Sequence, residues 1–464
     1  MGTVTGNVLD AAYQAAGGGT ADPVAARSQM GFSLGWHIIL ACLGVGMPGL
    51  VLFAEWRGWR TGDPWYQLLA RRWARALGVL FAVGAVSGTI LSFEMGVLWA
   101  GLMDHYGSVI GLPFAIEGFA FFIEAIFLGI YLYGWDRLPP KAHLLSGVPI
   151  VIAGVASAFF VVTANAWMNS PRGFKVVNGR LTGVDPWAAM FNSATGPETT
   201  HMILAAFMVT GFLIASVYAV AMLRGRTDRY HRLGLLISLT FGAVMTPIQI
   251  VVGDWAARFV GAGQPLKLAA MEGLNTSGRH VPESIGGYYS GGRLHWALRI
   301  PDGLSLLLHL NPGGYVTGLQ SAPASDRPSL ITVIHLAFDT MVGIGFGLLL
   351  LGAWLALAWW RDRSMPRSVW FLRATAVSGV AAVVAMESGW IVTEVGRQPW
   401  IVYGVLRVAD AVNPAPGLSW GLVAVVTVYA VLTVVTVYVL RRLARSRPVP
   451  EAPQEADVTG YKVV

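Results

Sequence analysis

The sequence predicts an all-α integral membrane protein with nine transmembrane helices. Apolar residues make up 55% of the 464 residues, and 56 glycines add to that fraction. Charged residues make up 12%, about half of the ~25% usual in soluble domains. A chain of this composition cannot cover a water-facing surface, which excludes a soluble multidomain protein. The single cysteine, Cys42, excludes a disulfide scaffold.

Nine apolar stretches account for the predicted helices. Each has about twenty or more residues, enough to cross ~30 Å of hydrocarbon as a helix. Runs rich in Leu, Ala and Gly without two-residue alternation are typical of helices and not of barrel strands. The predicted spans are residues 30–56, 76–103, 113–134, 143–168, 199–223, 233–255, 329–360, 369–393 and 418–440.

The distribution of Lys and Arg predicts how the helices are oriented. Most of these residues lie on one side, in the loops after the first, third, fifth and seventh spans and in the C-terminal segment. Positive residues favour the cytoplasm. We therefore expect the N-terminus outside and the C-terminus in the cytoplasm. The net charge of +7 is explained by this topology, and no nucleic-acid partner is expected.

Five segments follow from these spans. Residues 1–29 form an external N-terminal tail, and residues 30–255 hold helices one to six. Residues 256–328 form a long external loop, a type of segment that is usually functional or disordered. Residues 329–440 hold helices seven to nine, and residues 441–464 form a cytoplasmic tail.

Ionisable side chains inside the predicted spans indicate the functional site, because charges in a bilayer are costly. Glu117 and Glu124 are seven residues apart, so they share one helix face. His37, His201 and Glu394 fall within about two turns of the predicted external surface. The remaining intramembrane candidates are Glu94, His335, Asp339 and Glu387.

These residue types leave two classes of protein open. Histidines, carboxylates and methionines suit haem iron, whose axial ligands are typically His or Met. The same carboxylates and histidines suit the proton relay of a haem-free, proton-coupled transporter. On residue type alone, Met341 is more simply apolar packing, and His37 is as simply a histidine bonded to a helix carbonyl. Composition and spacing do not distinguish the two classes.

Short sequence strings do distinguish them. GRQPW covers residues 396–400, QPLKLAAMEG covers 264–273, PFAIEGFAFFIE covers 113–124 and FDTMVGIGFG covers 338–347. Over about residues 27 to 410 the chain resembles subunit I of the cytochrome bd quinol oxidases. It looks most like the branch with a short Q-loop, often called cyanide-insensitive.

The resemblance implies three haems: a low-spin haem b, a high-spin haem b and a haem d, or three b-type haems. His37 resembles the axial ligand of one high-spin haem, and Glu394 that of the other. His201 and Met341 resemble the two ligands of the low-spin haem b. The predicted spans place Met341 deeper than His201, and His335 is the rival ligand on the Met341 helix.

The resemblance also implies roles in catalysis. Lys267 and Glu272 match quinol-contacting residues of the Q-loop, which is the long external loop here. Glu117 and Glu124 match the carboxylates that deliver protons to the oxygen-reducing haem. Arg397 matches a residue packed beside the two high-spin haems, and so does Trp390.

The implied activity is oxidation of quinol at the outer face of the bacterial cell (inner) membrane and reduction of dioxygen to water with cytoplasmic protons. The implied partners are subunit II of the oxidase and a small single-helix subunit. One departure concerns Asp339, which stands two residues before Met341, where the commoner family pattern has Arg. We expect this departure to affect the low-spin haem.

Overall fold

The computed structural model describes residues 23–178, 180–366, 368–413 and 418–445. Within these residues nine helices are long and apolar enough to cross a membrane, which confirms the predicted fold class. The shortest has 28 residues, about 42 Å, so each exceeds a hydrocarbon core of about 30 Å. They are α2 Pro23–Thr61, α3 Pro64–Leu98, α4 Ala100–Gly134, α5 Pro140–Asn169, α7 Thr195–Leu223, α8 Arg229–Gly263, α11 Ile331–Asp362, α12 Val369–Arg397 and α14 Leu418–Arg445.

The helix starts follow local sequence signals. Asp63 accepts a hydrogen bond from the Trp65 amide at the start of α3, where Pro64 occupies the first turn. Asp228 accepts from the His231 amide at the start of α8. Such side chains satisfy amide groups that have no partner within the helix. The sharp connections between α2 and α3 and between α7 and α8 follow from these caps.

The predicted second span, residues 76–103, is wrong at its end. Helix α3 stops at Leu98, Trp99 leaves the helical conformation, and α4 begins at Ala100. The freed carbonyl groups of Val97 and Leu98 accept hydrogen bonds from the side chain and backbone of Asn413. A segment distant in sequence thus pairs the carbonyl groups that the end of α3 leaves without a helical partner. No sequence pattern near Trp99 predicts this helix end. The expected loop over residues 104–112 is helical.

Other predicted boundaries also shift. Residues 23–29 of the expected N-terminal tail belong to α2, and residues 441–445 of the expected C-terminal tail belong to α14. Helix α8 extends to Gly263, into the predicted external loop. The rest of both tails lies outside the described residues.

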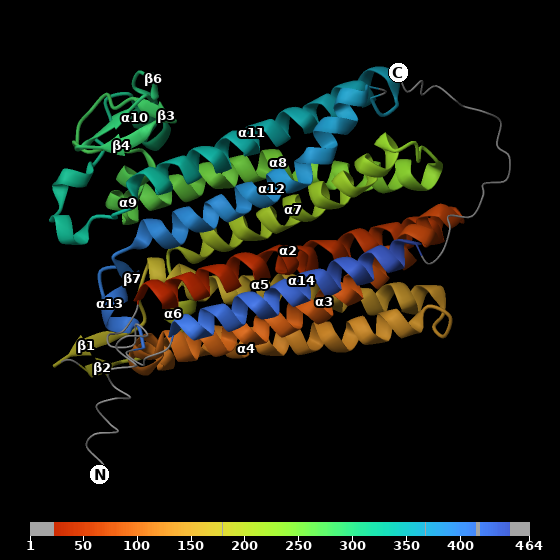
Figure 1. Cartoon of the computed structure of the whole chain (residues 1–464), viewed down its shortest axis with the longest axis horizontal. Coiled ribbons are helices and arrows are strands. Elements are labelled where there is room, and N and C mark those ends of the chain that lie inside the picture. The colour runs from red at the N-terminus through yellow and green to blue at the C-terminus, as the bar shows by residue number, and fades with distance from the viewer. Residues whose placement is uncertain (1–22, 179, 367, 414–417, 446–464) are drawn as a thin grey trace, which may run out of the picture.

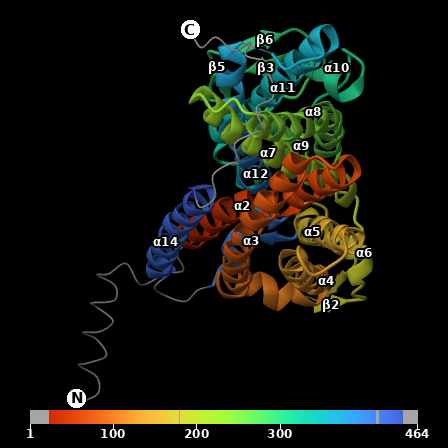
Figure 2. The same cartoon turned by 90° about the vertical axis from the view of Figure 1, so that its right-hand side faces the viewer.

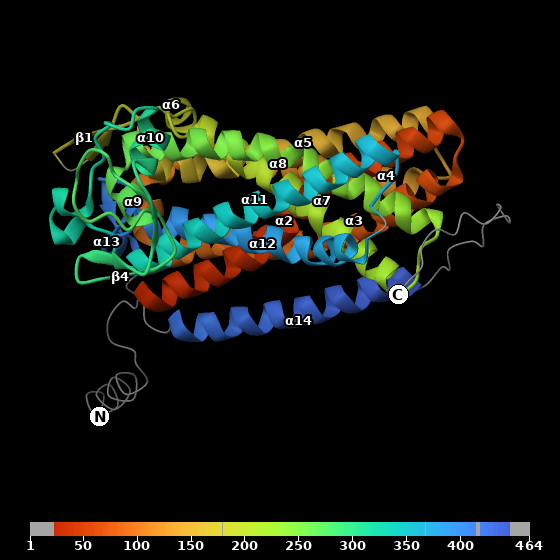
Figure 3. The same cartoon turned by 90° about the horizontal axis from the view of Figure 1, so that it is seen from above.

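The helices form two bundles of four. In the first, α2 and α4 each pack against α3 and α5, and in the second, α7 and α11 each pack against α8 and α12. Helix α2 packs against α7 and joins the bundles, whereas α14 lies outside and packs against α2 and α3 (Figures 2 and 3). A Cβ atom on Gly211 would lie 2.5 Å from the Gly242 nitrogen, so α7 and α8 approach closely because both residues are glycine.

The loops after α5, α8 and α12 gather at one end of the bundles, which we call the loop-bearing end (Figure 1). Here four short antiparallel strand pairs form, β1 with β2, β3 with β6, β4 with β5, and β7 with β8. The strands are β1 Lys175–Val177, β2 Arg180–Thr182, β3 Glu283–Ile285, β4 Tyr288–Ser290, β5 Arg293–His295, β6 Leu298–Ile300, β7 Trp400–Val402 and β8 Leu406–Arg407. The short helices are α6 Pro186–Met190, α9 Pro265–Met271, α10 Gly303–His309 and α13 Val408–Ala411.

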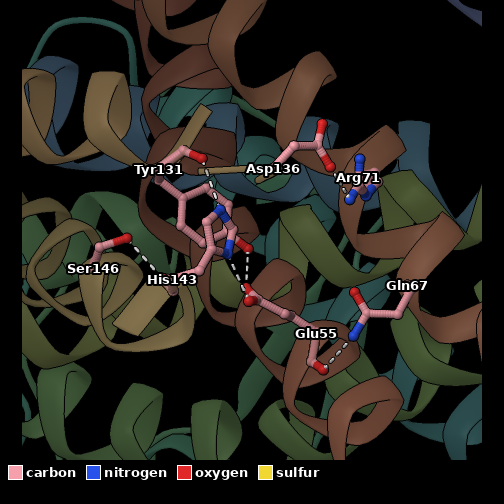
Figure 4. Close-up of polar contacts among 7 residues, drawn as sticks. All are labelled: Glu55, Gln67, Arg71, Tyr131, Asp136, His143 and Ser146. Atoms are coloured by element: carbon pink, nitrogen blue, oxygen red, sulfur yellow. Dashed lines mark hydrogen bonds and ion pairs between the residues drawn. The ribbon is translucent and has the colours of Figure 1, made fainter. Parts of the chain in front are cut away.

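The opposite end of the first bundle is held by a buried polar cluster (Figure 4). Glu55 of α2 accepts a hydrogen bond from Tyr131 of α4, at 2.5 Å, and lies 2.7 Å from His143 Nδ1 of α5. His143 Nε2 lies 2.9 Å from the Tyr131 carbonyl. Glu55 is 3% exposed and His143 is 2% exposed. Removing one member would leave a buried polar group unpaired, which typically costs about 1–3 kcal/mol, so the cluster stabilises the contact of three helices.

Candidate active site

His37 of α2 faces α3 in a geometry that defines its tautomer. Its Nδ1 lies 2.7 Å from Ser87 Oγ, and that hydroxyl donates to the Gly84 carbonyl at 3.0 Å. Because the hydroxyl proton is already used, His37 Nδ1 donates to Ser87 Oγ. Nε2 then carries the lone pair, which is the form in which a neutral imidazole binds a metal.

His201 and Met341 lie on α7 and α11, at opposite corners of the second bundle. Each faces a glycine on a neighbouring helix. A Cβ atom on Gly253 would lie 3.4 Å from His201 Cε1, and one on Gly389 would lie 3.0 Å from Met341 Sδ. His201 is also 3.3 Å from Gln249 Nε2. These glycines leave room for the two side chains between the helices.

The helix starts bring His201 and Met341 closer in depth than the sequence predicts. His201 lies six residues after the start of α7, and Met341 lies ten residues after the start of α11. The difference corresponds to about 6 Å along the helix axes. The predicted span limits implied about 15 Å on the same scale. The structure therefore reduces the difference in depth between the two side chains to about one helical turn.

His335, the rival ligand, is engaged elsewhere. Its Nδ1 lies 2.7 Å from the Met271 carbonyl and its Nε2 lies 3.0 Å from the Gly286 carbonyl. Both ring nitrogens thus face backbone carbonyl groups of the protein. Asp339 accepts from the Gly286 amide at 2.6 Å and lies 3.5 Å from His335 Nε2. These two residues fasten the long loop to α11.

Glu394 lies near the end of α12, with both carboxylate oxygens held. Asn165 Nδ2 donates to Oε1 at 2.5 Å, and Arg397 Nη2 donates to Oε2 at 2.6 Å. Arg397 is 2% exposed whereas the Glu394 side chain is 35% exposed, so only the guanidinium side of this charge-assisted pair is shielded from solvent. A carboxylate has about four acceptor positions and keeps capacity for a cation. Trp390, one turn earlier, packs against the main apolar core.

Asn169 of α5 is the centre of a network that the sequence analysis missed. Its Nδ2 donates to Asn165 Oδ1 at 3.1 Å and to Glu198 Oε1 at 2.9 Å. Its Oδ1 accepts from Arg397 Nη1 at 3.2 Å and from Gln264 Nε2 at 3.2 Å. The sequence held a weak signal, because Asn165 and Asn169 are four residues apart and share a helix face.

Lys267 and Glu272 are buried and lie in two different polar environments. Helix α9 folds onto α8, α11 and α12, which leaves Lys267 4% exposed and Glu272 5% exposed. A Cβ atom on Gly396 would lie 3.1 Å from Lys267 Cγ, so Lys267 packs against α12. Burial lowers the pKa of Lys267 to about 8, and Glu198 opposes that shift.

Glu272 lies instead beside Glu283 of β3. Burial raises the pKa of Glu272 well above its usual range, and the nearby Glu283 carboxyl raises it further. Burial, followed by the charge of Asp339, raises the pKa of Glu283 to about 7. This side of α9 is therefore able to hold a proton near neutral pH.

Glu117 and Glu124 share the face of α4 that meets α5, as their spacing predicts. Ser157 Oγ donates to Glu117 Oε1 at 3.0 Å. A Cβ atom on Gly154 would lie 3.5 Å from Glu124 Oε1. Glu124 is 5% exposed. The two carboxyl groups therefore lie one above the other between α4 and α5, inside the first bundle.

Together these positions fit haem binding. The His37 Nε2 carries a lone pair, His201 and Met341 lie at opposite corners of the second bundle, and Glu394 is held by Asn165 and by the buried Arg397 guanidinium. Within the described residues, no cluster of three His, Cys, Asp or Glu side chains would hold a bare metal ion. Single ligands from separate helices suit the iron of haem, which brings its own nitrogen ligands. The fold and site define a multi-pass membrane redox protein.

Comparisons with known proteins identify its family. The family model for cytochrome bd terminal oxidase subunit I matches residues 25–448. A putative cytochrome bd menaquinol oxidase subunit I from Bacillus subtilis is 38% identical, covering 93% of this chain and 98% of that protein. A cytochrome bd ubiquinol oxidase subunit 1 from the same organism is 29% identical, covering 90% and 92%. The solved bd oxidase from Geobacillus thermodenitrificans matches with a TM-score of 0.86 and 38% identity, covering 92% of this chain and 99% of that one.

The chain belongs to the cytochrome bd terminal oxidase subunit I family. It is subunit I of a quinol:oxygen oxidoreductase in the bacterial cell membrane. Membership of this family implies haem cofactors and a subunit II partner. The alternative of a haem-free transporter is therefore excluded.

Proposed function

We propose that this subunit oxidises quinol at the loop-bearing end, on the outer face, and reduces dioxygen to water with protons from the cytoplasm. The observation that carries the proposal is the placement of His37, His201 and Glu394 near that end, with Glu117 and Glu124 leading toward the opposite end. In this orientation the N-terminus is outside and the C-terminus is cytoplasmic.

Three haem positions follow from the four candidate ligands. His201 and Met341 would hold the low-spin haem b from opposite corners of the second bundle. His37 and Glu394 would each hold one high-spin haem. Bound haems supply electron transfer and an open iron position for dioxygen, and two strong ligands on the low-spin iron restrict it to electron transfer.

The protein residues supply positioning and proton handling. Lys267 would orient the quinol head group with a buried positive charge, and Glu272 with Glu283 would accept protons released from it. Arg397 and Asn165 hold the Glu394 carboxylate in one orientation. Glu124 and then Glu117 would pass protons toward the oxygen-reducing centre, since protonable carboxyls suit proton transfer.

The partners would be subunit II and a small single-helix subunit. Large apolar side chains are exposed on several membrane helices, α3, α4, α11 and α14 among them, and such surfaces are available for these contacts. Menaquinol is the quinol named for the relative with 38% identity, and ubiquinol for the one with 29%.

Spectra of ligand variants test the proposal. Met341→Leu conserves apolar volume, so packing alone predicts unchanged reduced-minus-oxidised spectra. If Met341 and His201 hold one iron, Met341→Leu and His201→Ala should both lose the low-spin band. His335→Ala is the control and should keep it. Loss of the band in His335→Ala alone would overturn the assignment. A pyridine haemochrome spectrum with haem extraction distinguishes two haems b and one haem d from three b-type haems.

A further inference from the structure

A pocket of about 320 Å³ opens at the loop-bearing end, among α5, α8, α9 and the hairpin of β7 and β8. It is separate from the surroundings of Glu272 and Glu283. Polar and aromatic side chains line it, including Asn169, Ser170, Ser193, Phe259, Gln264 and Tyr403. None of these residues is a proposed haem ligand or quinol contact.

The polar side of this pocket connects directly to Glu394. Gln264 is 2% exposed and Asn169 is 4% exposed, so both belong to the interior as well as to the pocket lining. Asn169 Nδ2 donates to Asn165 Oδ1 at 3.1 Å, and Asn165 Nδ2 donates to Glu394 Oε1 at 2.5 Å. Two hydrogen bonds therefore separate the pocket from the carboxylate.

Two buried polar atoms along this route have no hydrogen-bond partner in the described part of the chain. One is an acceptor, Gln264 Oε1, and the other is a donor, Arg397 Nε. Each residue also donates a hydrogen bond to Asn169 Oδ1, Gln264 through Nε2 and Arg397 through Nη1. Buried polar groups are nearly always paired, and ordered water commonly satisfies those that protein atoms leave over. An acceptor and a donor that share one neighbour suit bridging water.

The pocket mouth is polar on one side as well. Ser170 Oγ and Ser193 Oγ lie 2.6 Å apart, and each hydroxyl keeps further capacity for hydrogen bonds with water. The volume is enough for about ten water molecules at roughly 30 Å³ each. A continuous polar path thus runs from the surface to Glu394.

We propose that this pocket is a solvent port, through which water exchanges between the outer surface and the Glu394 centre along Gln264, Asn169 and Asn165. The proposal rests on the proposed function, because Glu394 is taken as a ligand of a high-spin haem. Oxygen reduction produces water inside the protein. The port gives that water an outlet at the loop-bearing end, away from the proton path along Glu124 and Glu117.

Cysteine labelling of the pocket tests the port in the purified oxidase complex. Ser193→Cys introduces a thiol at the exposed mouth, and the native Cys42 is fully buried, which keeps background labelling low. A charged methanethiosulfonate reagent is added. The association rate of hydrogen peroxide, a small water-soluble molecule that reacts with haem iron, is then followed by the absorbance of the high-spin haems. Each sample is measured before and after labelling. We expect a severalfold slower association after labelling, with the haem spectrum unchanged.

Thr182→Cys is the matched control, since Thr182 is exposed on β2 in the same loop and does not line the pocket. Its labelling should leave the rate unchanged. Gln264→Met, without any label, removes the unpaired acceptor and should also slow association. An unchanged rate in the fully labelled Ser193→Cys variant, or loss of its haem on labelling, overturns the port. Haem content and quinol-driven oxygen consumption before labelling report separately on the proposed function.

Discussion

Replacing Lys267 by arginine is expected to remove the alkaline limit of quinol oxidation. Burial lowers the pKa of Lys267 from 10.5 to about 8, against the opposing effect of Glu198. The ammonium group is therefore charged below about pH 8 and becomes neutral as the pH rises through that value. If the quinol head group is oriented by this charge, quinol oxidation must fall over the same range.

The magnitude follows from the pKa. One pH unit above its pKa, about a tenth of the Lys267 side chains remain protonated, so kcat/KM for quinol at about pH 9 should be about tenfold below its value at neutral pH. Arginine stays charged throughout this range. Lys267→Arg should therefore keep its neutral-pH activity up to about pH 9. The assay is steady-state oxygen consumption with quinol, measured as kcat/KM between about pH 6 and 9.5.

Lys267→Met is the matched control, because it has similar length and no charge. It should be slow at every pH, without an alkaline limb. An artificial donor that bypasses the quinol site should show none of these differences. The reasoning is refuted if an active Lys267→Arg variant retains an alkaline limb near the pKa of about 8.

Three further predictions concern the carboxylates. Glu394→Ala should lose one high-spin haem and oxygen reduction, because an oriented anion is removed beside Arg397; full haem content with normal turnover would exclude the ligand role. Glu117→Gln and Glu124→Gln preserve shape but cannot carry a proton, so stopped-flow measurements should show slower oxygen reduction with normal reduction of the low-spin haem. Glu272→Gln should slow quinol oxidation with all haems retained, and equal slowing with an artificial donor would contradict this.

The helical fold was accessible from sequence because it depends on composition and length alone. All nine spans were found, since long apolar runs have few alternatives in a bilayer. The helix ends were harder to predict. The break at Trp99 depends on Asn413, more than three hundred residues away in sequence, which caps two carbonyl groups of α3. Helix α8 ends at Gly263, directly before Gln264 and Pro265, so the proline that starts α9 marks its end and hydropathy does not.

Intramembrane charges and sequence strings shared with the family indicated the candidate site residues. The sequence did not indicate which residues hydrogen-bond to them. Asn169, Glu198 and Gln264 come from three separate elements, and their contact depends on how α5, α7 and α9 meet. Asn and Gln are also common in loops for other reasons, so their type carries little information. Only the packing shows that one asparagine connects Arg397 with Glu198.

The burial of α9 changes how the two Q-loop residues should be understood. Lys267 and Glu272 are five residues apart, about 140° around a helix, so they face different neighbours. Lys267 is electrostatically coupled to Glu198 and Arg397, whereas Glu272 is coupled to Glu283 and Asp339. One short helix thus separates a buried positive charge from a protonatable carboxyl pair. A quinol head group at the end of α9 would meet the charge on one side and the proton acceptors on the other, so orientation and proton release are assigned to different faces of the same helix.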